Sequence, residues 1–106
     1  MNDDYIYFTV TDPQNRSIRL YNDTWDHITS GHPEIKKVSE IQSIIQKPHV
    51  ITEVTEEKLA YTKISSLNLY VNVYVKVDST QQKGKIKTAF IQSKMPKGDV
   101  IWTATK

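Results

Sequence analysis

The chain has 106 residues, of which 38% are hydrophobic and 25% charged, a composition that is typical of one globular domain over residues 1–106 and excludes a disordered chain. It has no cysteine, which excludes disulfides and thiolate metal sites and favours a reducing, cytoplasmic location. The acidic start, Met1 to Asp4, lacks the pattern of a secretory signal. The longest apolar-rich stretch, residues 67–77, is too short to span a bilayer.

The net charge of +2 conceals two halves of opposite sign. Residues 1–57 carry five basic and ten acidic side chains, whereas residues 58–106 carry nine Lys and two Asp. The two Arg, Arg16 and Arg19, both belong to the acidic half. A basic half attracts polyanions such as nucleic acid, although a solvated Lys-rich surface produces the same composition.

The first half of the sequence predicts a hairpin followed by two helices. Residues 5–10 and 17–21 read as strands, and the turn at 12–15 joins them. A helix begins at Asp23 or Thr24 and runs to Ser30, where Gly31 ends it in a left-handed conformation. A second helix runs from Pro33 to Gln46. It buries an apolar stripe made of Ile35, Val38, Ile41, Ile44 and Ile45.

The second half predicts a series of strands at residues 50–52, 60–64, 67–77, 85–94 and 100–103. In the strand at 67–77 every odd position is aliphatic, so one face of this strand belongs to the core. Such alternation favours an antiparallel sheet over a parallel sheet that is buried on both faces. The sequence therefore predicts an α+β fold, with N-terminal helices packed on an antiparallel β-sheet meander.

Two histidines flank the predicted end of the first helix. His27 and His32 lie on either side of Gly31, and Glu34 follows two residues later. A histidine and a carboxylate in such a place can transfer protons, as cleavage of RNA by its own 2′-hydroxyl requires. The alternative is structural: His27 packs beside Trp25, and His32 caps a helix. Two histidines one turn apart on a single helix are missing, so we expect no metal and no cofactor.

The predicted strands add residues suited to contacts with a nucleic acid. Lys63, Thr88, Ser93 and Lys97 suit phosphate contacts. The tyrosines Tyr61, Tyr70 and Tyr74 can stack on bases, although tyrosines on a sheet also pack across strands. The sequence has no Gly-rich phosphate loop and no Ser nucleophile motif.

The order of these features resembles that of the barnase/EndoU/colicin/RelE-like superfamily, notably its RNase modules from phage and polymorphic toxins. The shared pattern is the run from Trp25 to Ile28, then His32-Pro33-Glu34 and an Ile-rich helix ending at Pro48. Tyr61 and Lys63, the long hydrophobic strand and the segment Lys87-Thr88-Ala89-Phe90 follow. Members of this superfamily cleave RNA without a metal. The resemblance implies that the catalytic residues are His27, His32, Lys63 and Thr88. Around them we expect contacts to RNA from Glu34, Tyr61, Lys87, Ser93 and Lys97.

Other functions fit the same residues. A non-catalytic module of the same fold would hold RNA or a protein on its basic strands. One half of a toxin–antitoxin pair would bind an acidic protein inhibitor there, through charge complementarity. In each case we expect RNA or an acidic protein as the partner and no association with a membrane.

Overall fold

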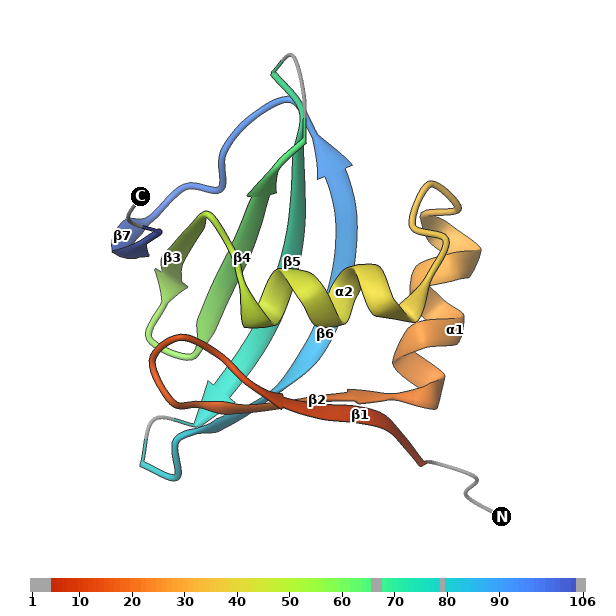
Figure 1. Cartoon of the computed structure of the whole chain (residues 1–106), viewed down its shortest axis with the longest axis horizontal. Helices are drawn as coiled ribbons and strands as arrows, with labels where there is room; N and C mark the ends of the chain where they lie inside the picture. Colours follow the sequence, from red (N-terminus) through yellow and green to blue (C-terminus); the bar gives the residue numbers. More distant parts are fainter. Residues whose placement is uncertain (1–4, 66–67, 79, 105–106) are drawn as a thin grey trace.

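The computed structural model describes residues 5–65, 68–78 and 80–104 and is dominated by one seven-stranded sheet (Figure 1). The strand order is β1-β2-β6-β5-β4-β3-β7, and two helices lie between β2 and β3 in the chain. The elements are β1 (Ile6–Thr11), β2 (Ser17–Tyr21), α1 (Asn22–Gly31), α2 (Val38–Gln46), β3 (Val50–Thr55), β4 (Lys58–Ile64), β5 (Tyr70–Asp78), β6 (Lys83–Gln92) and β7 (Asp99–Thr103). Over these ranges, no helix has the length and apolarity needed to cross a membrane.

The predicted fold class is wrong, because helices do not form the N-terminal layer and the sheet is not a purely antiparallel meander. The chain opens with the hairpin β1–β2, and this hairpin joins the sheet through β2, which pairs with β6 in parallel. The other neighbouring strands pair antiparallel, so the sheet is mixed. Ile18 and Leu20 of β2 are fully buried, which shows why this hairpin is part of the core and not an extension of it.

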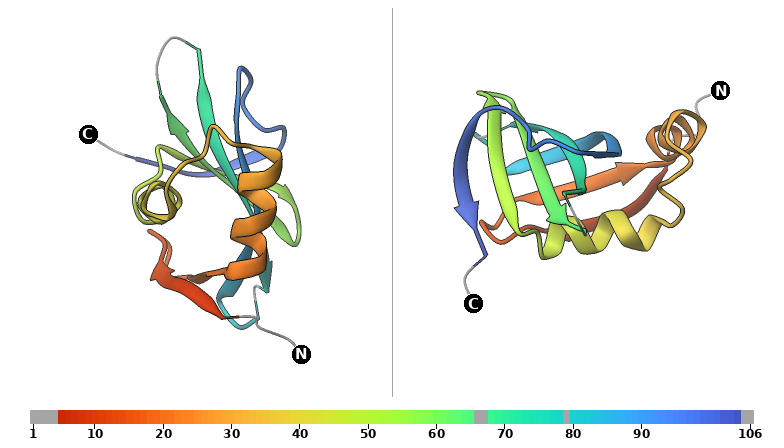
Figure 2. Two further views of the ribbon diagram at one scale, coloured as in Figure 1. Left: turned by 90° about the vertical axis from the view of Figure 1, so that its right-hand side faces the viewer. Right: turned by 90° about the horizontal axis from the view of Figure 1, so that it is seen from above.

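The sheet has a core face and a polar face. Tyr61, Val73 and Ala89 mark the core face, where they pair across β4, β5 and β6. The helix α2 packs on this side against β4 and β5, and Figure 2 shows the connection between β6 and β7 running past the other side. The predicted apolar stripe is buried: Ile41, Ile44 and Ile45 of α2 are in the core, and Val38 packs against them. Ile35 is also buried, but it lies in the segment before α2.

The polar face is the opposite side of the same strands. Thr62 of β4 pairs with Asn72 of β5, and Asn72 pairs with Phe90 of β6. One step along, Tyr74 pairs with Thr88. These five residues define the polar face, and its polarity contrasts with the aliphatic core face.

Both helices depart locally from their predicted ends. Gly31 closes α1 without a left-handed conformation, and the chain leaves the helix through His32, whose φ is −137° and ψ 72°. The second helix begins at Val38 and not at Pro33. Glu40 explains this start, because its carboxylate accepts the backbone N–H groups of Lys36 and Lys37 at 3.1 and 3.2 Å. The preceding residues are thereby held as a turn.

The long strand also starts later than its alternation predicts. The strand β5 begins at Tyr70, and Leu69 is 42% exposed. Val73, Val75 and Val77 are buried as predicted. Leu67, which the sequence assigns to the same strand, lies outside the described residues, as do the four N-terminal residues.

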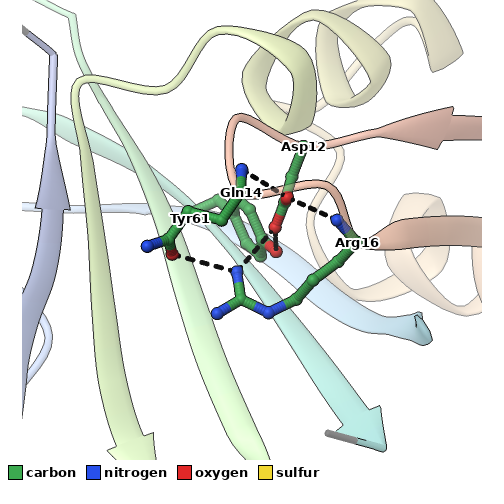
Figure 3. Close-up of polar contacts among 4 residues, drawn as sticks. All are labelled: Asp12, Gln14, Arg16 and Tyr61. Carbon is green, nitrogen blue, oxygen red and sulfur yellow. Dashed lines mark hydrogen bonds and ion pairs between the residues drawn. The ribbon is translucent and has the colours of Figure 1, made fainter. Parts of the chain in front are cut away.

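A buried carboxylate fixes the β1–β2 turn to the sheet (Figure 3). Asp12 accepts the backbone N–H groups of Gln14 and Arg16 at 2.8 and 2.9 Å through Oδ1. Its Oδ2 accepts the Arg16 guanidinium at 2.8 Å and the Tyr61 hydroxyl at 2.5 Å. The expectation that Tyr61 contacts RNA is therefore wrong, because this ring is fully buried on the core face and its hydroxyl is bound to Asp12.

Candidate functional site

The helix α1 runs beside β6 and leads to the candidate site. The strand β2 pairs with β6 only from Ser17 to Arg19, and the chain then continues directly into α1. This helix packs against both strands, and Figure 1 shows it alongside β6. The outer edge of β6 beyond Lys85 therefore has no strand partner among the described residues, and the turn after α1 lies against it.

The ring of His32 is held by an aromatic stack on the polar face. Its centroid lies 4.9 Å from that of Phe90, with the two planes 23° apart. Phe90 in turn stacks on Tyr74, at 5.5 Å and 15°. Stacking from one side orients the imidazole, which stays 36% exposed. Such fixed orientation favours proton transfer, since a catalytic group must be held within hydrogen-bond reach of its substrate.

Glu34 sets the chemistry of this imidazole. Its Oε2 lies 3.6 Å from His32 Nδ1 and accepts the backbone N–H of Ile91, on the unpaired edge of β6, at 3.4 Å. The pKa of Glu34 is lowered by its own backbone N–H, by that of Ile91, and by the charges of His32 and Lys36. An ionised carboxylate here favours a proton on Nδ1 and leaves Nε2 free to accept another.

His27 lies in the second half of α1. It is exposed and sits one helical turn before Gly31. Earlier in the helix, Trp25 packs against the core and Asn22 accepts the backbone N–H of Tyr5. The helix therefore places His27 one turn before its end, and His32 follows directly after that end. Within the described residues, His32 contacts Phe90 and Glu34, and no ring contact or ion pair joins it to His27.

A hydrogen-bonded chain of polar side chains underlies the stack. Thr62 donates to Asn72 Oδ1 at 2.6 Å, and the Asn72 amide donates to Gln92 Oε1 at 2.7 Å. The Tyr74 hydroxyl donates to the same Gln92 oxygen at 3.1 Å, and burial raises the pKa of Tyr74. Sequence reasoning missed Asn72 and Gln92. A usable signal was present, because an Asn in the middle of an otherwise buried strand needs partners.

The other predicted residues are divided between the two faces. Thr88 lies on the polar face, half-buried and opposite Tyr74. Lys87 beside it is exposed and is the extra residue of a β-bulge, so it has no paired residue in β5. Ser93 and Lys97 are exposed in the connection after β6.

Lys63 does not join this group. It pairs with Val71 on the core face, at the end of β4. There it lines a groove beside α2 with a volume of about 670 Å³, together with Glu40 and Ile44. The structure therefore brings His32, Glu34 and Thr88 to β6 and leaves Lys63 on the other side of the sheet.

Basic residues gather at the far end of the polar face. Lys85 of β6 pairs with Arg19 of β2 on one side and with Lys76 of β5 on the other. Sequence reasoning missed Arg19, since nothing local connects residue 19 with residue 85. A cluster of three or more His, Cys, Asp or Glu able to hold a metal ion is absent from the described ranges.

Comparisons with known protein families, curated proteins and solved structures found no match to this chain. The superfamily resemblance is therefore a hypothesis that depends on this chain's own residues.

Proposed function

We propose that this chain is a ribonuclease that cleaves RNA without a metal, through attack of the RNA's own 2′-hydroxyl, on the polar face beside β6. The observation that supports it best is the arrangement of His32. Its ring is stacked on Phe90, and its Nδ1 faces the Glu34 carboxylate, so that Nε2 remains for a substrate. An imidazole oriented by a carboxylate is a recurrent solution for proton transfer near neutral pH.

The reaction assigns one task to each group. His32 Nε2 takes the proton of the 2′-hydroxyl as the 2′-oxygen bonds to phosphorus. The bond from phosphorus to the 5′-oxygen breaks, which yields a 2′,3′-cyclic phosphate. His27, one turn before the end of α1, gives a proton to the leaving 5′-oxygen. The Thr88 hydroxyl donates to a phosphate oxygen, where charge develops in the transition state.

The test is cleavage of total RNA in EDTA by the wild type, His32→Ala and a matched histidine control, His49→Gln. His49 is the control because its Nδ1 accepts the Ile64 backbone N–H at 2.8 Å, away from the polar face. We expect cleavage by the wild type and by His49→Gln, with 2′,3′-cyclic phosphate ends, and a loss of about 10²-fold or more in His32→Ala. Intact RNA after long incubation with micromolar wild type, or full activity in His32→Ala, would contradict the proposal.

A non-catalytic RNA-binding module is the second candidate. The Tyr74–Phe90 stack and the neighbouring Lys76–Lys85 pair favour it, because aromatic rings and cations together hold single strands without any chemistry. This candidate expects salt-sensitive RNA binding with no cleavage. An acidic protein inhibitor would fit the same basic end, and its copurification with the chain would support the toxin–antitoxin version.

A further inference from the structure

The basic end of the polar face is a groove and not only a run of exposed lysines. A cavity of about 310 Å³ lies where β2, β5 and β6 meet, and its lining includes Arg19, Lys76, Lys83, Lys85 and one acidic residue, Asp78. None of the four basic side chains forms an ion pair within the part of the chain that the structure describes. The groove therefore holds an excess of positive charge that the described residues do not neutralise.

Arg19 gives this groove a specific donor. It lies between the buried residues Ile18 and Leu20 of β2, so its side chain points to the opposite side, into the groove. One guanidinium nitrogen donates to the Tyr21 hydroxyl at 3.5 Å. The Nε atom is buried and has no hydrogen-bond partner among the described residues. A buried donor without an acceptor is unfavourable, and the guanidinium fork matches the oxygens of a phosphate.

Asp78 is the acidic residue of the groove, but its carboxylate accepts hydrogen bonds from Thr80. Its Oδ1 accepts both the hydroxyl and the backbone N–H of Thr80, at 2.6 and 3.1 Å. The hydroxyl of Thr80 is the main cause that lowers the pKa of Asp78. This carboxylate is thus engaged in its own turn, and within the described residues Arg19 forms no ion pair.

We infer that this groove binds a backbone phosphate of the RNA strand. In the RNA, this phosphate is the neighbour of the one that Thr88 contacts in the proposed reaction. The pairs Tyr74–Thr88 and Lys76–Lys85 are successive steps on the polar face, about 6.6 Å apart at the rise of a β-strand. One nucleotide of an extended strand spans such a step. The placement beside the reacting phosphate rests on the proposed function, whereas the anion site does not.

The test measures binding of a fluorescent single-stranded DNA oligonucleotide, which lacks the 2′-hydroxyl and so survives the proposed cleavage. Wild type, Arg19→Gln, Lys85→Gln and the control Lys47→Gln are compared over a range of salt concentrations. Lys47 is exposed at the end of α2 and absent from the groove lining. We expect each groove variant to bind about tenfold more weakly and to lower the salt slope by about 0.7, while Lys47→Gln binds like the wild type.

The outcomes separate this inference from the proposed reaction. Lys85 is exposed, so Lys85→Gln keeps the test informative if Arg19→Gln does not fold. Binding that is equal in the wild type and both groove variants overturns the phosphate site, even if RNA is cleaved. Loss of binding in both groove variants supports the site, even if the wild type leaves RNA intact and the ribonuclease proposal fails.

Discussion

Asp12 is a carboxylate that is only 4% exposed, and each of its oxygens accepts two hydrogen bonds from the protein. Burial of a charge is costly unless such partners replace water. The Tyr61 hydroxyl is the one donor that comes from another strand, so it joins the β1–β2 turn to β4. This single bond connects a local turn, which Arg16 and Gln14 already shape, to the middle of the sheet.

Replacing this tyrosine tests the connection. We expect Tyr61→Phe to lower the free energy of unfolding by about 1–3 kcal/mol at neutral pH, because a buried carboxylate oxygen loses one donor. Urea unfolding followed by circular dichroism measures the difference. A variant as stable as the wild type would show that Arg16 alone satisfies Asp12.

The same pair of proteins gives a test at alkaline pH. Burial, and then the bond to Asp12, raise the pKa of Tyr61 far above its ordinary value of 10.0. A raised pKa in the folded state adds stability below the pKa of the unfolded state, and this stability is lost as pH rises beyond it. The advantage of the wild type over Tyr61→Phe should therefore shrink above about pH 10. A constant difference from pH 7 to the onset of alkaline unfolding would contradict this.

At the scale of elements, the edge of β6 explains the position of Glu34. Only residues 83–85 of this strand pair with β2, so the Ile91 N–H would face outward without a partner strand. The turn after α1 supplies the Glu34 carboxylate to this N–H and, at the same time, to His32. One side chain thus covers a strand edge and orients the candidate proton-transfer group.

We expect Glu34→Gln to fold, because an amide oxygen still accepts the Ile91 N–H, but to cleave RNA about tenfold or more slowly, because His32 loses its carboxylate partner. Activity in EDTA measures this effect.

The lowered pKa of Glu34 adds stability above the unfolded pKa, and this stability is lost as pH falls through the folded pKa. The stability advantage of the wild type over Glu34→Gln should therefore disappear in acid. An advantage that grows in acid would contradict this assignment.

The sequence predicts these elements well and their pairing poorly. Strand and helix periodicity located β2, α1 and β6 within two residues of their observed ends, because burial of one face is a local property. The partner of β2 is not local, and nothing in residues 17–21 specifies residues 83–85. The same limit applies to the site. His32 and Glu34 meet because they share a turn, whereas Lys63 was grouped with Thr88 without knowledge of which face each occupies.

At the scale of the whole molecule, the fold combines the two oppositely charged halves of the chain. Arg19 belongs to the acidic half, yet it lies beside Lys85 because β2 pairs with β6. Ile18, its neighbour in β2, pairs with Gly84 at the same junction. The sequence alone separates Arg19 from the basic strands, and the parallel pairing of β2 with β6 removes this separation. This junction therefore determines both the closure of the core and the composition of the basic groove.

Gly84 is the residue on which this junction depends. A methyl group there would lie 2.7 Å from the Lys76 carbonyl oxygen and 2.9 Å from methyl groups of both Val75 and Val77. Gly84→Ala must push β6 away from β5, and we expect it to lower the free energy of unfolding by about 1–3 kcal/mol. It should also weaken binding of single-stranded oligonucleotides, since Arg19 and Lys85 face each other across this junction.

The matched control is Gly31→Ala, because the residue is helical and a methyl group there would meet no described atom within 4 Å beyond its chain neighbours and its own helix backbone. Alanine favours a helix over glycine, so this variant should be as stable as the wild type or more stable by up to about 1 kcal/mol. Urea unfolding of both variants, with oligonucleotide binding measured on each, checks the pair. If Gly84→Ala were as stable as Gly31→Ala and bound oligonucleotides equally well, the close approach of β5 and β6 would not control the groove. A loss of both properties in Gly84→Ala alone would mean that one strand pairing sets the stability of the core and the position of the basic side chains.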